Sequence, residues 1–410
     1  MGGAVPSRSA YRERQPSSWR DILVSYPVLN VKRANFLAKE GQLRLDRRDS
    51  ASFSMFRSAF CLVIGFSVFH SASALTIVLD YGDDAATDNF FATHPVAKAT
   101  LEKARNDLQA AITTTLAAAT DTSSGSNGAT TATYNFSLGY TNPSTGAAVN
   151  LADASLGADQ VKIFVGMREL GGSTLGQGGP GSTGLSVGGS GSPAQWPGAV
   201  TNTNAVASTN RLRGGGPIIS TLTGTVSLGG TPGSVSVQTG SAVGNLWFDN
   251  DSNNDTVTDT DPQLDAYWHF DFNTPVASGK SDFYSVALHE MLHVLGFGIG
   301  VSWNSNVSGT TWLGSEVTSL MGTGAGMVDG GGAHVASGVT SPRLSDGVLQ
   351  ETVMSPSIVV GTRKQLTQLD LAFMRDFGWS TITTVPEPGV AGLAVLGLAP
   401  LIRRRRNSHA

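Results

Sequence analysis

The order of apolar and polar positions predicts a mixed α+β protein. Residues 75–79 form an apolar run and residues 161–165 alternate, so both are expected to be strands. Residues 95–115 carry apolar side chains at helical spacing, which predicts a helix. Weaker strands are expected over 235–238 and 245–248.

The most apolar helix is expected around residues 285–296. Its side chains are apolar in every direction, which is typical of a buried helix. It nevertheless holds His289, Glu290 and His293, and buried polar groups are costly without a partner. Because residues four apart share one helix face, the two imidazoles can bind one Zn²⁺, with the Glu290 carboxylate near its open side. The alternative is a core helix whose histidines only find hydrogen bonds.

A final helix is expected over 367–378, capped by Thr367 and ended at Gly378. Two stretches rich in Gly, Ser and Thr interrupt the regular pattern. Residues 171–215 are expected to be a long loop or a loosely structured insertion, and residues 297–333 a second long excursion.

Both ends of the chain have the pattern of targeting signals. Residues 55–74 hold a short basic segment, an apolar run and a small-residue cleavage site, which predicts a secretory signal peptide. Residues 1–54 are therefore interpreted as a start codon assigned too early, the alternative being an unusually long basic region before the signal. Residues 385–410 join Pro-Glu-Pro, an apolar run and four arginines. The run is shorter than the roughly 20 residues of a spanning helix.

That C-terminal order of parts resembles the PEP-CTERM sorting signal, the alternative being a plain membrane anchor. The resemblance implies processing by an exosortase-type enzyme and transient membrane contact through the C-terminal segment. It also implies an exported protein at the cell surface or in the extracellular matrix of a Gram-negative bacterium.

Removing both ends changes the charge. The full chain has a formal net charge of −4, but residues 75–386 hold 12 Lys and Arg against 25 Asp and Glu, a net of −13. An acidic exported domain argues against nucleic acid as a partner. The only cysteine, Cys61, lies in the signal segment, so no disulfide is expected in the exported part.

One acidic segment is a candidate Ca²⁺ site. Oxygen-bearing side chains alternate there as they do in a calcium loop, at Asp249, Asp251, Asn253 and Asp255. The turn glycine is replaced by Asn254, and no acidic residue closes the loop. Bound Ca²⁺ is therefore a hypothesis, with a solvated acidic turn as the alternative.

A catalytic zinc needs a third protein ligand and an open position. His94 is expected at the surface and His269 in the core or at its rim. His334 is the best candidate, because it lies between the zinc helix and the turn around Met354. The acidic alternatives as third ligand are Glu316, Glu351 and, more remotely, Asp329.

His289-Glu290-x-x-His293-x-x-Gly296, followed by a methionine turn, resembles the metzincin zinc peptidases. The usual third histidine stands three residues past the glycine, where this chain has Ile299. The leishmanolysin-like branch inserts a long segment before that histidine, and residues 282–379 are similar to it. The similarity lies in Phe297-Gly298, Trp303, the displaced His334, Val353-Met354-Ser-Pro356 and residues 366–379, whereas Val335 stands where the branch often has Trp.

The resemblance implies a metzincin-like catalytic domain over 75–384, with a twisted mixed sheet, an active-site helix and a smaller C-terminal subdomain across a cleft. We therefore hypothesise an exported zinc metalloendopeptidase acting on proteins or peptides. Zinc would activate a water, Glu290 would act as general base, and Met354 would form an apolar floor. The alternatives are a non-catalytic surface or matrix protein with a structural zinc site, and a zinc hydrolase of a non-peptide amide.

Overall fold

The computed structural model describes residues 75–151 and 153–383. The interpretations of residues 1–54, 55–74 and 385–410 therefore concern segments outside the described residues. In the part of the chain that is described, no helix is both long and apolar enough to cross a membrane.

A four-stranded mixed sheet, in the order β1-β5-β10-β6, forms the main layer. Strands β1 (Thr76–Asp80), β5 (Gln160–Arg168) and β10 (Val243–Asp249) are parallel, and β6 (Gly176–Pro180) pairs antiparallel with β10 at the edge. Every residue of β10 is buried, as expected where both faces of a parallel sheet are covered. The strands predicted near 75–79, 161–165 and 245–248 are confirmed.

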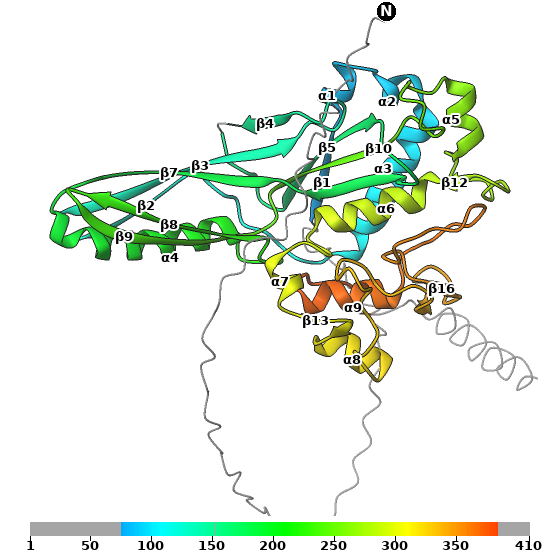
Figure 1. The fold of residues 1–410 in the computed structure, drawn as a ribbon. Helices are drawn as coiled ribbons and strands as arrows, with labels where there is room; N and C mark the ends of the chain where they lie inside the picture. Colours follow the sequence, from blue (N-terminus) through cyan, green and yellow to red (C-terminus); the bar gives the residue numbers. More distant parts are fainter. Residues whose placement is uncertain (1–74, 152, 384–410) are drawn as a thin grey trace, which may run out of the picture. The chain divides into compact units, whose positions relative to one another are not determined.

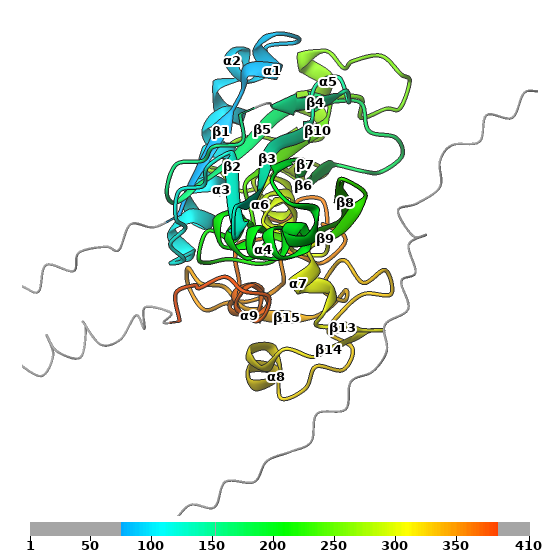
Figure 2. The ribbon, with the colours of Figure 1, turned by 90° about the vertical axis from the view of Figure 1, so that its left-hand side faces the viewer.

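Helices α3 (Pro95–Ala111) and α6 (Phe283–Val294) pack against each other and on the main sheet. The apolar side of α3 is buried through Ala97, Leu101, Ala104 and Leu108. The helix ends four residues before the predicted end at residue 115, because Ile112 is extended and bridges Thr381. Both views show α6 between the sheet and the C-terminal part of the domain (Figures 1 and 2). The short elements near the sheet are α1 (Gly82–Ala85), α2 (Phe90–Thr93), α5 (Asp261–Tyr267), β11 (Trp268–His269) and β12 (Ser281–Asp282).

The part after α6 packs around an aromatic cluster. Helix α9 (Gln368–Asp376) starts at Thr367, which forms a capping box with Asp370, so the predicted final helix and its cap are confirmed. The aromatic cluster comprises Phe297, Trp303, Trp312, Phe373 and Phe377. Short elements fill the stretch between the helices: α7 (Val301–Asn304), β13 (Val307–Ser308), β14 (Thr311–Trp312), α8 (Ser315–Met321), β15 (Thr340–Pro342) and β16 (Leu349–Glu351).

Two insertions between strands of the main sheet pack together into what we call the arm (cyan-green to green, toward the left in Figure 1). It has its own core around Tyr134, Trp196, Val200 and Val237. The arm comprises β2 (Thr122–Asn127), β3 (Thr130–Thr141), β4 (Ala148–Leu151), β7 (Ser182–Ser190), the 3₁₀ turn η1 (Pro193–Gln195), α4 (Trp196–Leu212), β8 (Ser220–Leu228) and β9 (Thr231–Thr239).

The prediction of a long loop or loosely structured insertion over 171–215 is wrong about its structure, because the insertion is regularly folded. That stretch holds β6, β7, η1 and α4. Its many Gly residues have weak helix and strand propensity, which is why the pattern indicated a loop. Tertiary packing decides otherwise, because α4 buries Trp196, Ala199 and Val200 in the core of the arm.

Candidate metal centre

Helix α6 is fixed at both ends. The Asp282 side chain caps it by accepting a hydrogen bond from the Ser285 N–H at 3.1 Å. At the other end Gly296 has a φ of 101°, a conformation that favours glycine, so the chain turns away directly after the helix. The Trp379 indole N–H donates to the Leu295 carbonyl at 2.9 Å and holds this end.

Three imidazoles converge beside α6. The His293 Nε2 atom lies 3.2 Å from His289 Nε2 and 3.2 Å from His334 Nε2. Among the residues described, this is the one group of three or more His, Cys, Asp or Glu side chains placed closely enough to hold a metal ion.

The opposite nitrogen of each ring faces an acceptor. His289 Nδ1 lies 2.8 Å from the Val353 carbonyl, and His293 Nδ1 lies 2.8 Å from the Phe297 carbonyl. His334 Nδ1 lies 3.6 Å from the Asp329 carboxylate. Acceptors at Nδ1 favour the tautomer that keeps its proton there, so the Nε2 lone pairs are free to bind a metal.

The geometry fits a zinc ion. Nitrogen ligands about 2.1 Å from zinc at tetrahedral angles would lie roughly 3.4 Å apart, close to the two separations of 3.2 Å from His293. The three rings would supply the three protein ligands that a catalytic zinc needs.

Burial lowers the pKa of all three histidines. The pKa of His293 is lowered to about 4, and the neighbouring imidazoles add to the effect of burial on His289. Burial also lowers the pKa of His334, although the Asp329 carboxylate opposes it. At neutral pH the rings are therefore uncharged, which is the form that binds a metal.

Burial raises the pKa of Glu290 to about 8, although a hydrogen bond from the Gly178 N–H opposes the shift. A divalent cation at the three imidazoles would lower this pKa again, because opposite charge favours the carboxylate. Strand β6 approaches the helix closely here, since a Cβ at Gly178 would lie 2.2 Å from the Glu290 carbonyl oxygen. Only glycine fits at that position.

The three histidines and Glu290 line a cavity of about 790 Å³. One wall is β6, the edge strand of the main sheet, which among the described residues pairs only with β10. Val353, residues 355–358 and Lys364 also line the cavity. A cavity of this size bordered by a free strand edge has room for an extended chain.

The segment that carries His334 is held on both sides. The Asp329 carboxylate accepts the N–H groups of Ala333 and His334, each at 3.0 Å. Val335 donates to the Met354 carbonyl at 2.9 Å. A Cβ at Gly298 would lie 2.3 Å from the Ala333 carbonyl oxygen, so glycine is required for this close approach.

Met354 lies fully buried in the turn predicted around it. Asp370 holds this turn, because its buried carboxylate accepts the N–H groups of Val353 at 3.2 Å and Met354 at 3.4 Å. The same carboxylate accepts the Thr367 hydroxyl at 2.7 Å. The cap of α9 therefore positions the carbonyl that orients His289.

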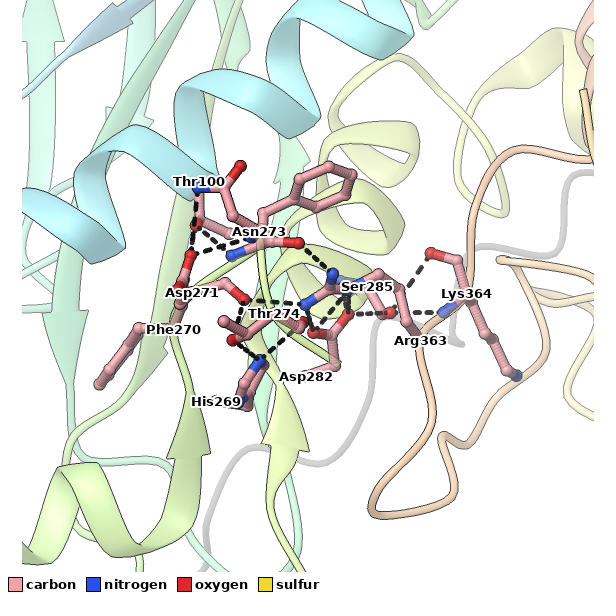
Figure 3. A network of polar contacts seen from close by, with 11 residues as sticks. Thr100, His269, Phe270, Asp271, Asn273, Thr274, Asp282, Ser285, Arg363 and Lys364 are labelled. Atoms are coloured by element: carbon pink, nitrogen blue, oxygen red, sulfur yellow. Dashed lines mark hydrogen bonds and ion pairs between the residues drawn. The ribbon is translucent and has the colours of Figure 1, made fainter. Parts of the chain in front are cut away.

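A second polar network ties the start of α6 to the segment before α9 (Figure 3). The Arg363 guanidinium donates to the buried Asp282 carboxylate at 2.8 and 3.0 Å. It also lies over the Phe272 ring, 4.6 Å from the centroid. The Ser285 hydroxyl accepts the Lys364 N–H at 2.7 Å, so helix and segment are joined at two points.

The other candidate ligands lie elsewhere or are engaged. Glu316 pairs with Arg375 at 2.7 Å, and Glu351 pairs with Lys364 at 2.8 Å. Asp329 stands behind the His334 ring. His94 is partly buried, not at the surface as predicted, and stacks on Phe90, while buried His269 lies 3.3 Å from the Thr274 carbonyl.

Of the four proposed calcium ligands, two are buried and two are exposed. Asp249 and Asp251 are buried, and the Asp251 carboxylate accepts the N–H groups of Asp255 and Thr256 at 3.1 and 2.8 Å. Asn253 and Asp255 are exposed and bond each other. The loop thus already uses these oxygens, and bound Ca²⁺ stays a prediction.

Sequence reasoning missed Asp370 as a support of the site and β6 as its wall. The capping box at Thr367 was the available signal for Asp370, but it did not reveal that the carboxylate also binds a distant turn. The chain matches no protein-family model, no curated protein and no solved structure.

Proposed function

We propose that this chain is a zinc-dependent endopeptidase. The observation that carries the proposal is the convergence of three imidazoles. The Nε2 atoms of His289 and His334 each lie 3.2 Å from the Nε2 atom of His293. The Nδ1 atom of each ring faces an oxygen acceptor that orients the ring, as is usual for metal-ligating histidines. Export and exosortase-type processing remain predictions from the sequence.

Bound zinc would supply a Lewis acid that polarises a carbonyl and lowers the pKa of water to about 7. Glu290 faces the same cavity and is suited to act as general base. It would take a proton from the attacking water as the water oxygen bonds to the carbonyl carbon. It would then pass this proton to the leaving amine as the C–N bond breaks.

The cavity favours a peptide as substrate. An extended peptide can add to a free strand edge through main-chain hydrogen bonds, and β6 offers such an edge beside Glu290. A purely structural zinc site would need neither the cavity nor the buried carboxylate, so both features favour catalysis over a structural role.

The test compares the full chain with Glu290→Gln in zinc content and casein digestion. We expect equal zinc, and hydrolysis lower by roughly 10²- to 10⁴-fold in the variant, the usual range for a lost acid–base group. Glu316→Gln, which changes an exposed carboxylate paired with Arg375, serves as the matched control and should keep full activity. Unchanged activity of Glu290→Gln, or a wild-type chain without zinc, would overturn the proposal.

A further inference from the structure

Helix α4 closes one edge of the hairpin formed by β8 and β9. The Asn204 side chain accepts the Ser236 N–H at 3.1 Å and donates to the Ser234 carbonyl at 2.8 Å. The Ser208 hydroxyl accepts the Gln238 N–H at 3.1 Å. Side chains of α4 thus satisfy the outer edge of β9 in place of a neighbouring strand.

The other edge of this hairpin is open. Thr221 stands opposite Gln238, and Thr223 opposite Ser236. In an antiparallel ladder, opposed residues turn their backbone groups either toward each other or both away. The backbone N–H groups of Gln238 and Ser236 bond α4 and so point away from β8. The backbone groups of their opposed residues, Thr221 and Thr223, therefore point away from β9. In the described part of the chain these backbone groups have no hydrogen-bond partner, and β7 forms no ladder with β8.

Nothing along β8 protects this edge. Natural edge strands usually carry a charge, a proline or a bulge that prevents pairing with another chain. Strand β8 spans nine residues with none of these, and its Thr221, Thr223 and Thr225 are exposed. Between Glu169 and Asp249 the only charged residues are Arg211 and Arg213, and both are buried.

We propose that the β8 edge is a self-association surface, where a second copy of the chain adds its own β8 antiparallel. A two-fold axis at Gly224 places Thr223 opposite Thr225 of the other copy, so the edge is complementary to itself. A Cβ at Gly224 would meet nothing within 4 Å, so the sheet face beside this axis is uncovered.

Among the surfaces of the molecule, the uncharged arm is the place where a second copy can bind. Residues 75–386 carry a net charge of −13, so two copies repel over most of their surface. The arm around β8 presents hydroxyl and amide groups without charge, so two copies can meet there with little repulsion. Cross-strand threonine pairs add a favourable contact. This inference concerns the arm and does not depend on the proposed catalysis.

The first test measures the mass of the full chain by sedimentation over a concentration series. We expect a weak dimer that grows with concentration, since an edge of this length gives a small interface. Thr223→Lys should abolish it by placing a charge on the edge, and Thr223→Pro by removing an outward N–H that β9 does not use. Ser234→Lys, on the exposed side of the closed strand β9, is the matched control and should dimerise like the wild type.

The second test fixes the register. In a Cys61→Ser background, Gly224→Cys should form a disulfide dimer, because the two residues at the axis would have Cα atoms about 4.5 Å apart. Ser234→Cys should not. Circular dichroism and thermal melting verify that each variant folds. A wild-type mass that stays monomeric throughout the series, or edge variants that associate like the wild type, would overturn the proposal.

Discussion

At the scale of single residues, the candidate centre depends on the groups behind the rings. His289 and His293 face main-chain carbonyls, which no side-chain substitution removes. His334 faces the carboxylate of Asp329, so it is the ring whose support can be changed alone.

We expect Asp329→Asn to weaken zinc binding by about 10- to 100-fold, the usual effect of losing an outer partner of a ligating histidine. The amide oxygen can still accept the N–H groups of Ala333 and His334, so the fold should be retained. Competition titration with a chelator measures the affinity. Asp346→Asn, in an exposed pair with Arg343, is the control and should bind zinc like the wild type. Equal affinity of the Asp329 variant would contradict the assigned role.

At the scale of elements, helix α6 presents two rings on its own, but the third depends on how closely the following segments approach it. Gly298 is the point of contact, because it has a φ of 77° and faces the Ala333 carbonyl. The approach of these two segments therefore sets the position of His334.

Gly298→Ala should push the His334 segment outward and lower both stability and zinc affinity. A matched control separates the effect of the close contact from the cost of the left-handed backbone conformation. Gly326→Ala has a similar φ of 69° but meets nothing within 4 Å, so it should cost only the roughly 1–2 kcal/mol of the left-handed conformation. Urea unfolding and zinc titration of both variants measure the difference. Equal losses in the two variants would show that the close contact has no effect.

The polar network that joins Arg363 to Asp282 at the start of α6 gives a second expectation at this scale. Arg363→Met leaves the buried Asp282 carboxylate without its cation, which should cost about 3 kcal/mol in the free energy of unfolding. Arg343→Met breaks an exposed pair and should change stability by less than about 1 kcal/mol. Chemical denaturation measures both. If Arg363→Met lowered the free energy of unfolding no more than Arg343→Met, the buried ion pair would contribute nothing to stability.

At the scale of the whole molecule, carboxylates paired across the chain determine the response to acid. Burial alone would raise the pKa of Glu351, but hydrogen bonds from Gly338, Lys364 and Ser355 outweigh it and hold the pKa below its ordinary value. The pKa of Asp80 is likewise lowered, since contacts with Lys162 and Gly82 outweigh burial.

A carboxyl group with a lowered folded pKa stabilises the protein above its unfolded pKa, here 4.5 for Glu351, and this stability is lost as the pH falls through the folded value. The free energy of unfolding should therefore decrease below about pH 4.5, and less steeply in Glu351→Gln. Denaturation at several pH values, with a chelator present, measures this. The imidazoles contribute equally to both proteins and cancel in the difference. Parallel pH curves for the two proteins would refute the expectation.

Local features of the site could be predicted from the sequence. The spacing of His289 and His293 places two rings on one helix face in any helix, and Thr367 caps α9 through residues only three positions away. Both depend on neighbours in the chain, which the sequence specifies directly. The strands near 75–79, 161–165 and 245–248 were also predictable from neighbouring residues, but their parallel pairing joins segments far apart in the chain.

Other features required contacts between distant residues. Asp370 binds the turn at Met354, and Asp329 supports His334, but no periodic pattern marks either role. Strand β6 and helix α4 lie in a stretch whose composition favours loops. They form because α4 buries one face in the arm while its polar side chains satisfy strand edges.

The sequence by itself therefore determined the chemistry available to this protein: two imidazoles and a carboxylate on one buried helix, with a glycine that turns the chain away. Only the tertiary structure decided which distant residue completes the set, what orients each ring, and which strand edges stay open. The physical reason is that helix geometry follows from neighbouring residues, whereas convergence and edge pairing depend on packing between segments far apart in the chain.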